Sequence, residues 1–222
     1  MNQFKMPFNV SYLMYMSLGI LMVALLAYTQ HVEFEPGMSS KLQQQPSLNT
    51  ELLQELSDDL AHYNIEHDVD FSHAVLRLTS EELLFASGQA DLPEKQQTAL
   101  QNISLVLEKN LICYANGQQV VANSHCQKPQ QVNLKSIIIE GHTDNVPVSV
   151  TTSAKDNMEL SAKRARAVYE KIVKSTLRDL KNNISETLFT IAAYGDSQPL
   201  NHYSQPTPDA KNRRIDIRFV FL

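Results

Sequence analysis

Several features that would indicate a common class of protein are missing from this sequence of 222 residues. There is no excess of positive charge: the net charge is −5 and the isoelectric point about 5.8, which argues against nucleic-acid binding driven by bulk charge. There is no internal repeat and no long low-complexity tract. Hydrophobic residues make up 43% and charged residues 19%, which is sufficient for one packed domain with additional short segments.

Charged residues are also absent from one long stretch near the N-terminus. No Asp, Glu, Lys or Arg occurs between Met6 and Gln30, and Val10–Tyr28 is almost wholly apolar. At about 1.5 Å per residue, a helix over this segment spans roughly 28 Å, enough to cross a bilayer core. Because Lys5 precedes it and Glu33 follows, the positive-inside rule predicts a cytoplasmic N-terminus and an exported C-terminal part.

The apolar segment has one alternative interpretation. It could be a cleaved signal peptide with a weak cleavage site after Ala27, but the run exceeds the usual apolar length of about 7–15 residues. No cysteine lies near it, which excludes a bacterial lipoprotein anchor. No ionisable residue lies within it either, although such residues mark ion and proton pathways through membranes. We therefore predict an uncleaved membrane helix over residues 10–30, in contact with membrane lipid.

The exported part is predicted to contain a connecting region and one folded domain. Residues 31–47 contain Pro, Gly, Ser and Gln without a period, which is typical of a linker. Ser47–Tyr63 has a leucine stripe opposite acidic residues, which predicts an amphipathic helix. This helix either packs on its own domain or pairs with a second copy, and we favour a contact in a homodimer. The predicted parts are a cytoplasmic tail (1–9), a membrane helix (10–30), a linker with an amphipathic helix (31–63) and a folded domain (64–222).

Apolar periodicity in the folded domain alternates between strands and helices. The predicted strands are Ala74–Leu78, Ser136–Glu140, Leu188–Tyr194 and Arg214–Leu222. The predicted helices are Pro93–Lys109 and Met158–Lys174. This order, β-α-β-α-β-β, predicts an α/β sandwich in which helices cover one face of a mixed sheet.

Only two cysteines occur, Cys113 and Cys126, between the first predicted helix and the second predicted strand. In an exported domain such a pair is typical of a disulfide. Closing a loop of about 14 residues contributes roughly 3 kcal/mol in the chain-entropy model. A zinc site that adds His125 lacks finger-type spacing, so we predict a disulfide that fixes the segment between the two cysteines.

Three polar segments occur at chain positions that are expected to converge. Glu140–Asp144 ends the central strand, Asn157–Ala165 begins the following helix, and Asn212–Arg214 precedes the last strand. In open α/β sheets, ligands bind beyond strand ends and near helix N-termini. The sequence therefore predicts a ligand site where these segments meet.

Four kinds of chemistry are compatible with a polar site of this composition. A metal site would use Glu140, His142 and Asp144, but no second cluster of His or Cys completes the ligand set. Nucleophilic catalysis would need a Ser or Cys held by a His, and no nucleophile elbow is present. A purely structural corner would pair Asp144 with Arg164 or Arg213.

The fourth chemistry is recognition of a zwitterion. The Asp144 carboxylate would pair with an ammonium group, and a nearby arginine would hold a carboxylate bidentately. The helix N-terminus would add backbone N–H donors for the same carboxylate. In an exported domain the abundant ligand with such an amino-acid end is the peptide stem of the cell wall.

Five spaced motifs resemble those of the OmpA-like peptidoglycan-binding family, the OmpA/MotB C-terminal family. They follow the family's order over about 135 residues, and together they are far more specific than the GHTD tetrapeptide alone. The motifs are FASGQADL (85–92), IIIEGHTDNVP (137–147), NMELSAKRARAV (157–168), AAYGDSQPL (192–200) and TPDAKNRRIDI (207–217).

This resemblance implies a function and a set of site residues. Asp144 of GHTD and Arg164 of N-x-x-L-S-x-x-R-A would clamp the free end of meso-diaminopimelate in the wall peptide. Asn212 and Arg213 would orient the bound stem or support the pocket rim. The candidate ligand-binding residues are Asp144, Arg164, Thr143, Asn157, Leu160, Asn212 and Arg213.

Two further features of the GHTD motif and its surroundings bear on the site: its His and Thr match the family, and two loops depart from the family's pattern. His142 and Thr143 match, and we expect both to be mainly structural. The loop Asn145–Asp156 is long, which would alter access to the pocket, and the loop before Asn212 is shortened. Neither departure removes a candidate residue.

One membrane helix followed by such a domain resembles the B subunit of ion-driven stators, of the flagellar MotB or the Zorya type. That family carries an Asp in the helix as the ion carrier, whereas this sequence has Leu13, Met14 and Tyr15 in the equivalent region. We therefore predict a non-enzymatic, dimeric, inner-membrane anchor without a cofactor, whose periplasmic domain binds peptidoglycan. The alternative is a stator B subunit that works with a polytopic MotA-like partner.

Overall fold

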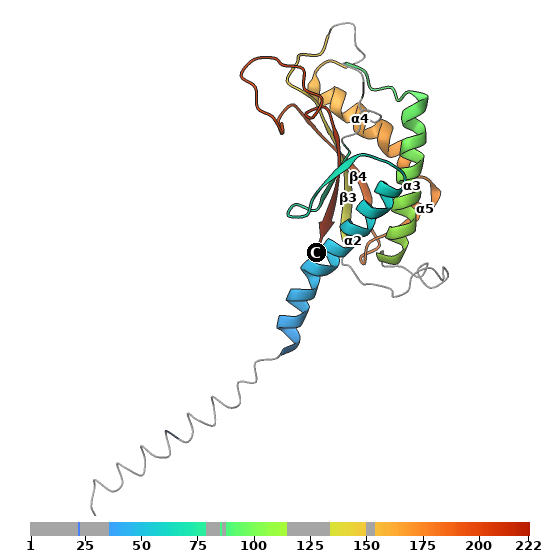
Figure 1. The fold of residues 1–222 in the computed structure, drawn as a ribbon, viewed down its shortest axis with the longest axis vertical. Helices are drawn as coiled ribbons and strands as arrows, with labels where there is room; N and C mark the ends of the chain where they lie inside the picture. Colours follow the sequence, from blue (N-terminus) through green and yellow to red (C-terminus); the bar gives the residue numbers. More distant parts are fainter. Residues whose placement is uncertain (1–21, 23–35, 79–84, 86–87, 115–133, 150–153) are drawn as a thin grey trace, which may run out of the picture. The chain divides into compact units, whose positions relative to one another are not determined.

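The structure, a computed structural model, describes residues 22, 36–78, 85, 88–114, 134–149 and 154–222. The chain divides into two compact units, Met1–Gln43 and Gln44–Leu222, and the second contains all the strands (Figure 1). Among the described residues, no helix is both long and apolar enough to cross a bilayer. The predicted membrane helix, residues 10–30, lies outside them apart from Met22 and stays a prediction.

A five-stranded mixed sheet forms the centre of the second unit, in the order β1-β2-β5-β3-β4. β3 and β4 are parallel, and every other neighbouring pair is antiparallel. The predicted α/β architecture with a mixed sheet is confirmed. The strands are β1 (His67–Asp70), β2 (Val75–Leu78), β3 (Leu134–His142), β4 (Phe189–Gly195) and β5 (Ile215–Phe221).

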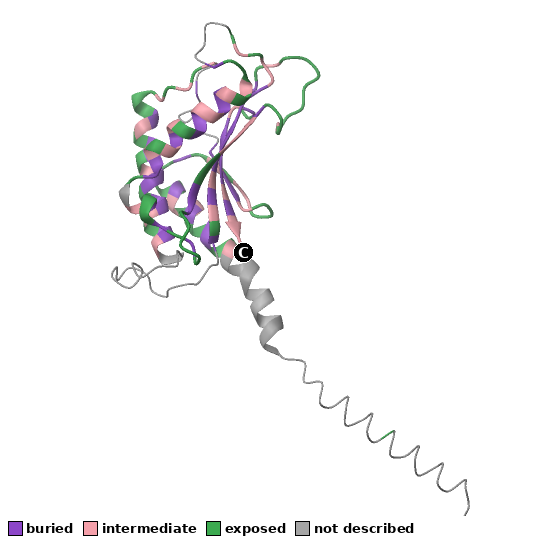
Figure 2. Cartoon of the chain, turned by 180° about the vertical axis from the view of Figure 1, so that it is seen from behind, coloured by how far each residue is buried: buried purple, intermediate pink, exposed green. Residues whose placement is uncertain are grey.

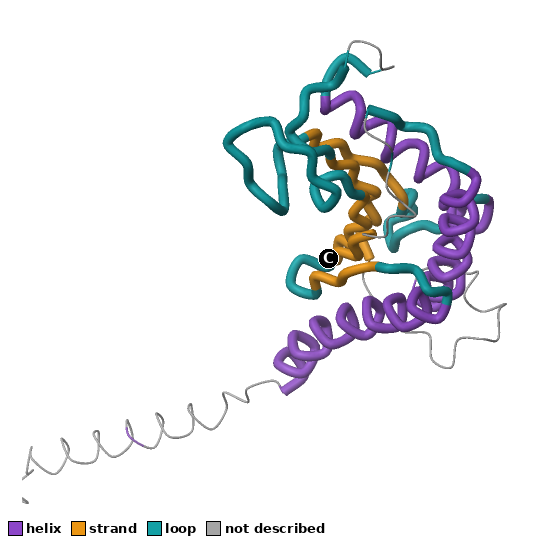
Figure 3. Tube along the Cα trace, turned by 45° about the horizontal axis from the view of Figure 1, so that its top comes forward, coloured by secondary structure: helices purple, strands orange, loops and turns teal. Residues whose placement is uncertain are grey.

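Helices cover one face of this sheet, as Figures 1 and 3 show. α4 packs on β3 and β4, and α3 packs beside α4. The helices are α2 (Pro36–His62), α3 (Glu94–Tyr114), α4 (Asn157–Ile172) and the short α5 (Ser175–Asp179). Within the folded domain, the predicted helices and strands all form, with ends that differ by up to five residues.

The central strand β3 separates two environments by simple alternation. Ile137 and Ile139 are fully buried and belong to the hydrophobic core under the helices. Glu140 and His142 are also buried. Because successive side chains of a strand point to opposite faces, these two point away from the helices and lie outside that core. Buried residues consequently run along the central strands as well as the inner faces of the helices (Figure 2).

The start of α4 is fixed by its cap, which matters because this end of the helix adjoins the candidate site. The Asp156 side chain accepts a 2.7 Å hydrogen bond from the backbone N–H of Glu159. In return, the Glu159 carboxylate accepts one from the backbone N–H of Lys155 at 2.9 Å. This reciprocal arrangement satisfies N–H groups that have no acceptor within the helix.

α2 begins earlier than predicted, at Pro36 rather than at Ser47, so most of the predicted linker is helical. Proline is compatible with a first helical turn, because its missing N–H would have no intrahelical acceptor there. The helix then extends to His62 and includes Pro46, which has no N–H to donate to the helix ladder.

The predicted role of the α2 leucine stripe in a dimer contact is wrong. All four leucines are at most 1% exposed within a single chain and form part of its core, so they are not available to a second copy: Leu52, Leu53, Leu56 and Leu60. The alternative, packing on its own domain, is the one observed. Asp59 ties α2 to α3 by accepting hydrogen bonds from Lys109 at 2.8 Å and from Asn110 at 2.7 Å.

The predicted disulfide involves a residue outside the described part of the chain. Cys113 lies in the last turn of α3, and Cys126 falls in the segment 115–133, which the structure does not describe. The pairing of Cys113 with Cys126 therefore stays a prediction.

Candidate ligand-binding site

The candidate site begins where β3 meets α4, and Gly141 makes this contact possible. A Cβ at this position would lie 2.9 Å from the carbonyl carbon of Ser161 and closer still to its oxygen. Only a residue without a side chain allows the helix backbone to approach the strand this closely. The strand register shifts just after Gly141, and Thr143 then donates its N–H to the Gly195 carbonyl at 2.8 Å.

Asp144 follows this irregularity and is only 7% exposed. Its Oδ2 accepts a 2.7 Å hydrogen bond from Nη1 of Arg213 and a 3.2 Å bond from the backbone N–H of Asp209. Its Oδ1 accepts a weaker bond, at 3.4 Å, from the backbone N–H of Val146. Asn157, the first residue of α4, donates to the Asp144 carbonyl oxygen at 3.3 Å. These contacts hold the carboxylate between the strand, the helix start and the segment before β5.

Among the described residues, Arg164 is the largest fully buried side chain, at 1% exposure. Its Nε donates to the Gln89 carbonyl at 2.9 Å, and its guanidinium lies 5.1 Å from the centre of the Phe85 ring. Burial lowers the pKa of Arg164 to about 10; Asp144 opposes that shift and Arg213 adds to it. Arg164 therefore stays protonated at neutral pH, and two guanidinium groups act on one carboxylate.

The predicted contacts around Asp144 are thus brought together in part. Arg213 makes an ion pair with the carboxylate, while Arg164 lies on α4 and contributes through its charge. Thr143 and Leu160 are buried beside them, at 2% and 3% exposure. Within the described part of the chain, Oγ1 of Thr143 and Nε of Arg213 are buried without a hydrogen-bond partner.

Asn212 shapes the loop that borders the site. Its Oδ1 accepts hydrogen bonds from the N–H groups of Leu200 and Asn201 at 2.7 and 3.0 Å, and its Nδ2 donates to the Asn201 carbonyl at 2.8 Å. The amide is therefore used inside the loop, as expected of a residue that supports the pocket rim.

Asn145 has a similar role, which the sequence analysis missed. Its side chain donates to the Gln205 carbonyl at 2.9 Å and accepts from the backbone N–H of Thr207 at 2.8 Å. The position of Asn145 directly after GHTD is the only feature of the local sequence that indicates such a role. The loop that it binds lies about sixty residues away along the chain.

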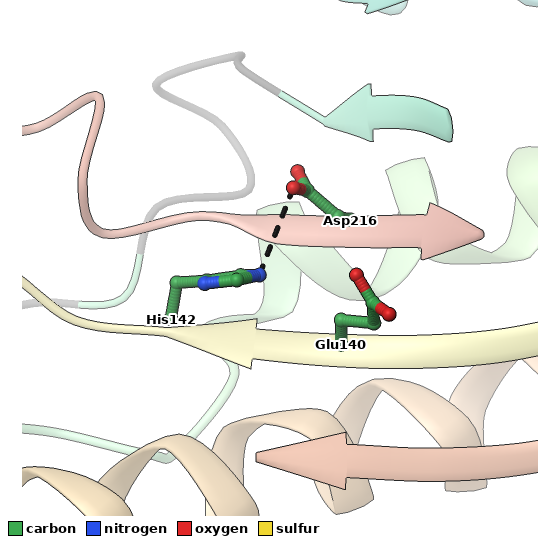
Figure 4. A group of neighbouring side chains, drawn as sticks. All are labelled: Glu140, His142 and Asp216. Atoms are coloured by element: carbon green, nitrogen blue, oxygen red, sulfur yellow. Dashed lines mark ion pairs between the residues drawn. The ribbon is translucent and has the colours of Figure 1, made fainter. Parts of the chain in front are cut away.

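A second polar cluster lies on the sheet face that points away from the helices (Figure 4). Glu140, fully buried, accepts hydrogen bonds from Nε and Nη2 of Arg218 at 2.7 and 2.9 Å. Asp216 pairs with Arg214 at 3.0 Å and with Arg77 at 3.3 Å. Nε2 of His142 lies 3.6 Å from a carboxylate oxygen of Asp216.

This cluster revises the metal hypothesis of the sequence analysis. Asp144 is separated from Glu140 and His142, and Asp216 takes its place, so that ligand atoms of these three residues lie within 4.8 Å of one another. Burial, together with the positive charges of the arginines at positions 214, 77 and 218, lowers the pKa of His142 to about 3. The same positive field opposes a cation, so the cluster is better described as a buried network of ion pairs.

Comparison with known proteins agrees with the motifs. The sequence model of the OmpA family matches residues 114–213, which include Asp144, Arg164 and Arg213. Residues 114–213 therefore match the OmpA family, and the resemblance is confirmed for this segment. A search of curated proteins found no match.

Several solved structures are similar in fold. A MotB-like protein from Desulfovibrio vulgaris has 21% identity and a TM-score of 0.59, over 81% of this chain and 98% of that one. The cell wall anchor of the T6SS from Pseudomonas aeruginosa has 23% identity and a TM-score of 0.48, over 77% and 96%. The periplasmic domain of Helicobacter pylori MotB has 20% identity and a TM-score of 0.45, over 66% and 75%. At such identities, the first of these establishes a shared fold alone.

Proposed function

We propose that this protein binds peptidoglycan non-covalently, through the free amino-acid end of diaminopimelate in the stem peptide. The observation that carries the proposal is the buried carboxylate of Asp144, held beside the guanidinium groups of Arg213 and Arg164 in a segment that matches the OmpA family. This is a site for binding rather than for catalysis, because the groups that converge are complementary charges rather than a nucleophile and a base.

The charges divide naturally between the two ends of a zwitterion. Oδ2 of Asp144 is already shared by Arg213 and the N–H of Asp209, whereas Oδ1 has only the long contact with Val146. We assign Oδ1 to the ligand ammonium. The carboxylate would lie against the arginines, where Nε of Arg213 is buried without a partner among the described residues. The N-terminus of α4 adds the positive end of its dipole to the same region.

The proposed biological role is a tether between the cytoplasmic membrane and the cell wall. The apolar segment Val10–Tyr28 would anchor the chain, and the OmpA-like domain would lie in the periplasm. A similar solved structure is called MotB-like, which keeps a stator B subunit with a polytopic partner as the alternative. The absence of any Asp, Glu, Lys or Arg between Met6 and Gln30 favours an anchor that does not itself relay ions.

Co-sedimentation of the full-length protein with purified sacculi tests the clamp. Asp144→Asn and Arg164→Lys keep the size of each side chain but remove the charge or the planar fork, and each is expected to leave the protein in the supernatant. Asp196→Asn and Arg166→Lys, at exposed positions, are the matched controls and should pellet like wild type. Thermal unfolding of each variant verifies that it is folded.

Competition distinguishes the proposed ligand chemistry from general adhesion. Free meso-diaminopimelate should release the protein from sacculi, whereas cadaverine, which has the same two amino groups but neither carboxylate, should not. If folded Asp144→Asn and Arg164→Lys variants pellet like wild type, the clamp is wrong. If cadaverine competes as well as diaminopimelate, the arginines do not select a zwitterion.

A further inference from the structure

A group of positively charged side chains lies around the end of α4 and the start of β3. All four are exposed, and none makes an ion pair with a described residue: Lys135, Lys174, Arg178 and Lys181. The acidic residues of the stretch 174–187 are Asp179 and Glu186, and the Glu186 carboxylate accepts a hydrogen bond from Asn182. This region therefore has an excess of positive charge in a chain whose net charge is −5.

Hydrogen bonds bring these residues together from two parts of the chain. Nδ2 of Asn182 donates to the carbonyl of Lys135 at 3.1 Å, so the start of β3 lies against the turn that follows α5. Nη2 of Arg178 donates to the carbonyl of Val173 at 3.3 Å, directly beside Lys174. The cations therefore belong to one surface rather than to separate loops.

This surface lies at the end of the domain opposite the candidate ligand site. β3 begins one residue before Lys135, whereas Asp144 follows the other end of the same strand. A strand of nine residues spans about 27 Å. α4 runs between the same two ends, because it starts at Asn157 beside Asp144 and ends two residues before Lys174.

The turn between Lys181 and Thr187 adds an apolar side chain to this end of the domain. Ile184 is 63% exposed, the most exposed large hydrophobic side chain among the described residues from 64 onward. The turn is held from within, because Oδ1 of the buried Asn182 accepts hydrogen bonds from the N–H groups of Ile184 at 3.1 Å and Glu186 at 2.9 Å. Ser185 has a φ of +66°, a left-handed conformation that is uncommon for a residue with a side chain. A fixed turn thus presents Ile184 to the outside.

We propose that this end of the domain docks on a bilayer that contains anionic phospholipids. The basic surface, defined as Lys135, Lys174, Arg178, Lys181 and Ile184, has the two features that such a bilayer recognises. Its cations attract the lipid phosphates, and its apolar side chain enters between the head groups. A nucleic acid would use the cations but would gain nothing from Ile184.

This inference goes beyond the proposed function and shares with it only a nearby membrane. A docked domain would hold its ligand site away from the bilayer, because the site lies at the other end of β3. Docking and peptidoglycan binding therefore use different surfaces and can be measured separately.

The sequence contains no tryptophan, so one introduced tryptophan reports on a single position. Full-length Ile184→Trp is reconstituted in vesicles of phosphatidylcholine and phosphatidylglycerol whose acyl chains carry bromine, which quenches a tryptophan that enters the bilayer. We expect strong quenching in these vesicles and little in brominated phosphatidylcholine alone. Leu105→Trp, on α3 at a position that is 54% exposed, is the matched control and should be quenched in neither. Asn183→Trp, in the same exposed turn, is the second reporter.

A pair of lysine substitutions tests the charges. Lys135→Gln with Lys181→Gln, added to Ile184→Trp, should lower the ratio of docked to undocked domain about 30-fold at low ionic strength. Lys155→Gln with Lys211→Gln removes the same charge from exposed positions at the other end of the domain and should leave the ratio unchanged. Circular dichroism establishes that each variant is folded.

The proposal is overturned if both reporters in the turn are quenched no more than Leu105→Trp, or equally without anionic lipid. It is also overturned if the two lysine pairs reduce quenching to the same extent. Co-sedimentation with sacculi separates this result from the clamp: Lys135→Gln with Lys181→Gln should pellet like wild type. A protein that docks on vesicles but does not bind sacculi would refute the proposed function and leave the docking surface in place.

Discussion

Replacing Gly141 by alanine tests how the site is assembled, because this glycine separates β3 from α4. The added Cβ would lie 2.9 Å from the carbonyl carbon of Ser161, nearer still to its oxygen, and 3.3 Å from Cβ of Ala165. The first two obstructing atoms belong to the helix backbone and cannot rotate away. The strand and the helix must therefore move apart.

The size of the effect follows from these contacts. Restoring an ordinary van der Waals separation requires a displacement of about 1 Å between β3 and α4. Overpacking of this kind costs about 3 kcal/mol of folding free energy when backbone atoms are involved. Asp144 follows β3 and Arg164 lies on α4, so the same displacement separates the two sides of the proposed clamp.

Urea unfolding and sacculus co-sedimentation of Gly141→Ala measure both consequences. Gly195→Ala is the comparison: Gly195 has φ +54°, and an added Cβ would approach Met158 N at 3.1 Å. We expect it to lose about 1 kcal/mol, mainly through backbone strain, and to keep most of its binding. A Gly141→Ala protein as stable as wild type would refute the steric argument, and one that is folded but binds normally would refute the link between helix spacing and the clamp.

Two further predictions concern the ion network behind the site. The pKa of His142 is about 3 in the folded protein, below its ordinary value of 6.5, so His142 contributes its full stability above 6.5 and loses it as the pH falls toward 3. Between neutral pH and about pH 5, the free energy of unfolding of wild type, measured with urea, should therefore fall by about 2 kcal/mol relative to that of His142→Gln. If the difference between the two proteins does not change with pH, the imidazole is not buried in its neutral form. Arg218→Met leaves the fully buried Glu140 carboxylate without its arginine partner and should lower the free energy of unfolding by about 3–5 kcal/mol. Adding Glu140→Gln should recover much of this loss. Equal stabilities of the single and double variants would argue against the pair.

The elements that could be predicted from the sequence are those with strong local patterns. The apolar run of β3 and the helical stripe of α4 follow from the spacing of side chains, so both were placed within two or three residues. β1 was missed because HDVD contains one apolar residue, and α5 because five residues are too few to show a period. The α2 stripe was recognised as apolar, but no local pattern states whether its partner is the same chain or another.

The candidate residues were predicted from motifs, whereas their arrangement could be predicted only in part. Motifs located Asp144 and Arg164, yet the shortest contact to the Asp144 carboxylate comes from Arg213, 69 residues away along the chain. That contact depends on β5 lying beside β3, so that its start adjoins the end of β3. The order of strands in a sheet is a global property, and neither it nor the Glu140–Arg218 pair can be read from local periodicity.

In the proposed tether between a membrane and a wall, the burial of the α2 leucine stripe has a mechanical consequence. A pull on the chain ahead of Thr50 that is directed along the axis of α2 would load the four buried leucines in shear, so that their contacts would fail together rather than in turn. Beyond the helix, the load would pass across one row of paired residues in the sheet: His67, Leu78, Ile215 and Gly141. Tension would therefore reach the central strand at Gly141, three residues before Asp144.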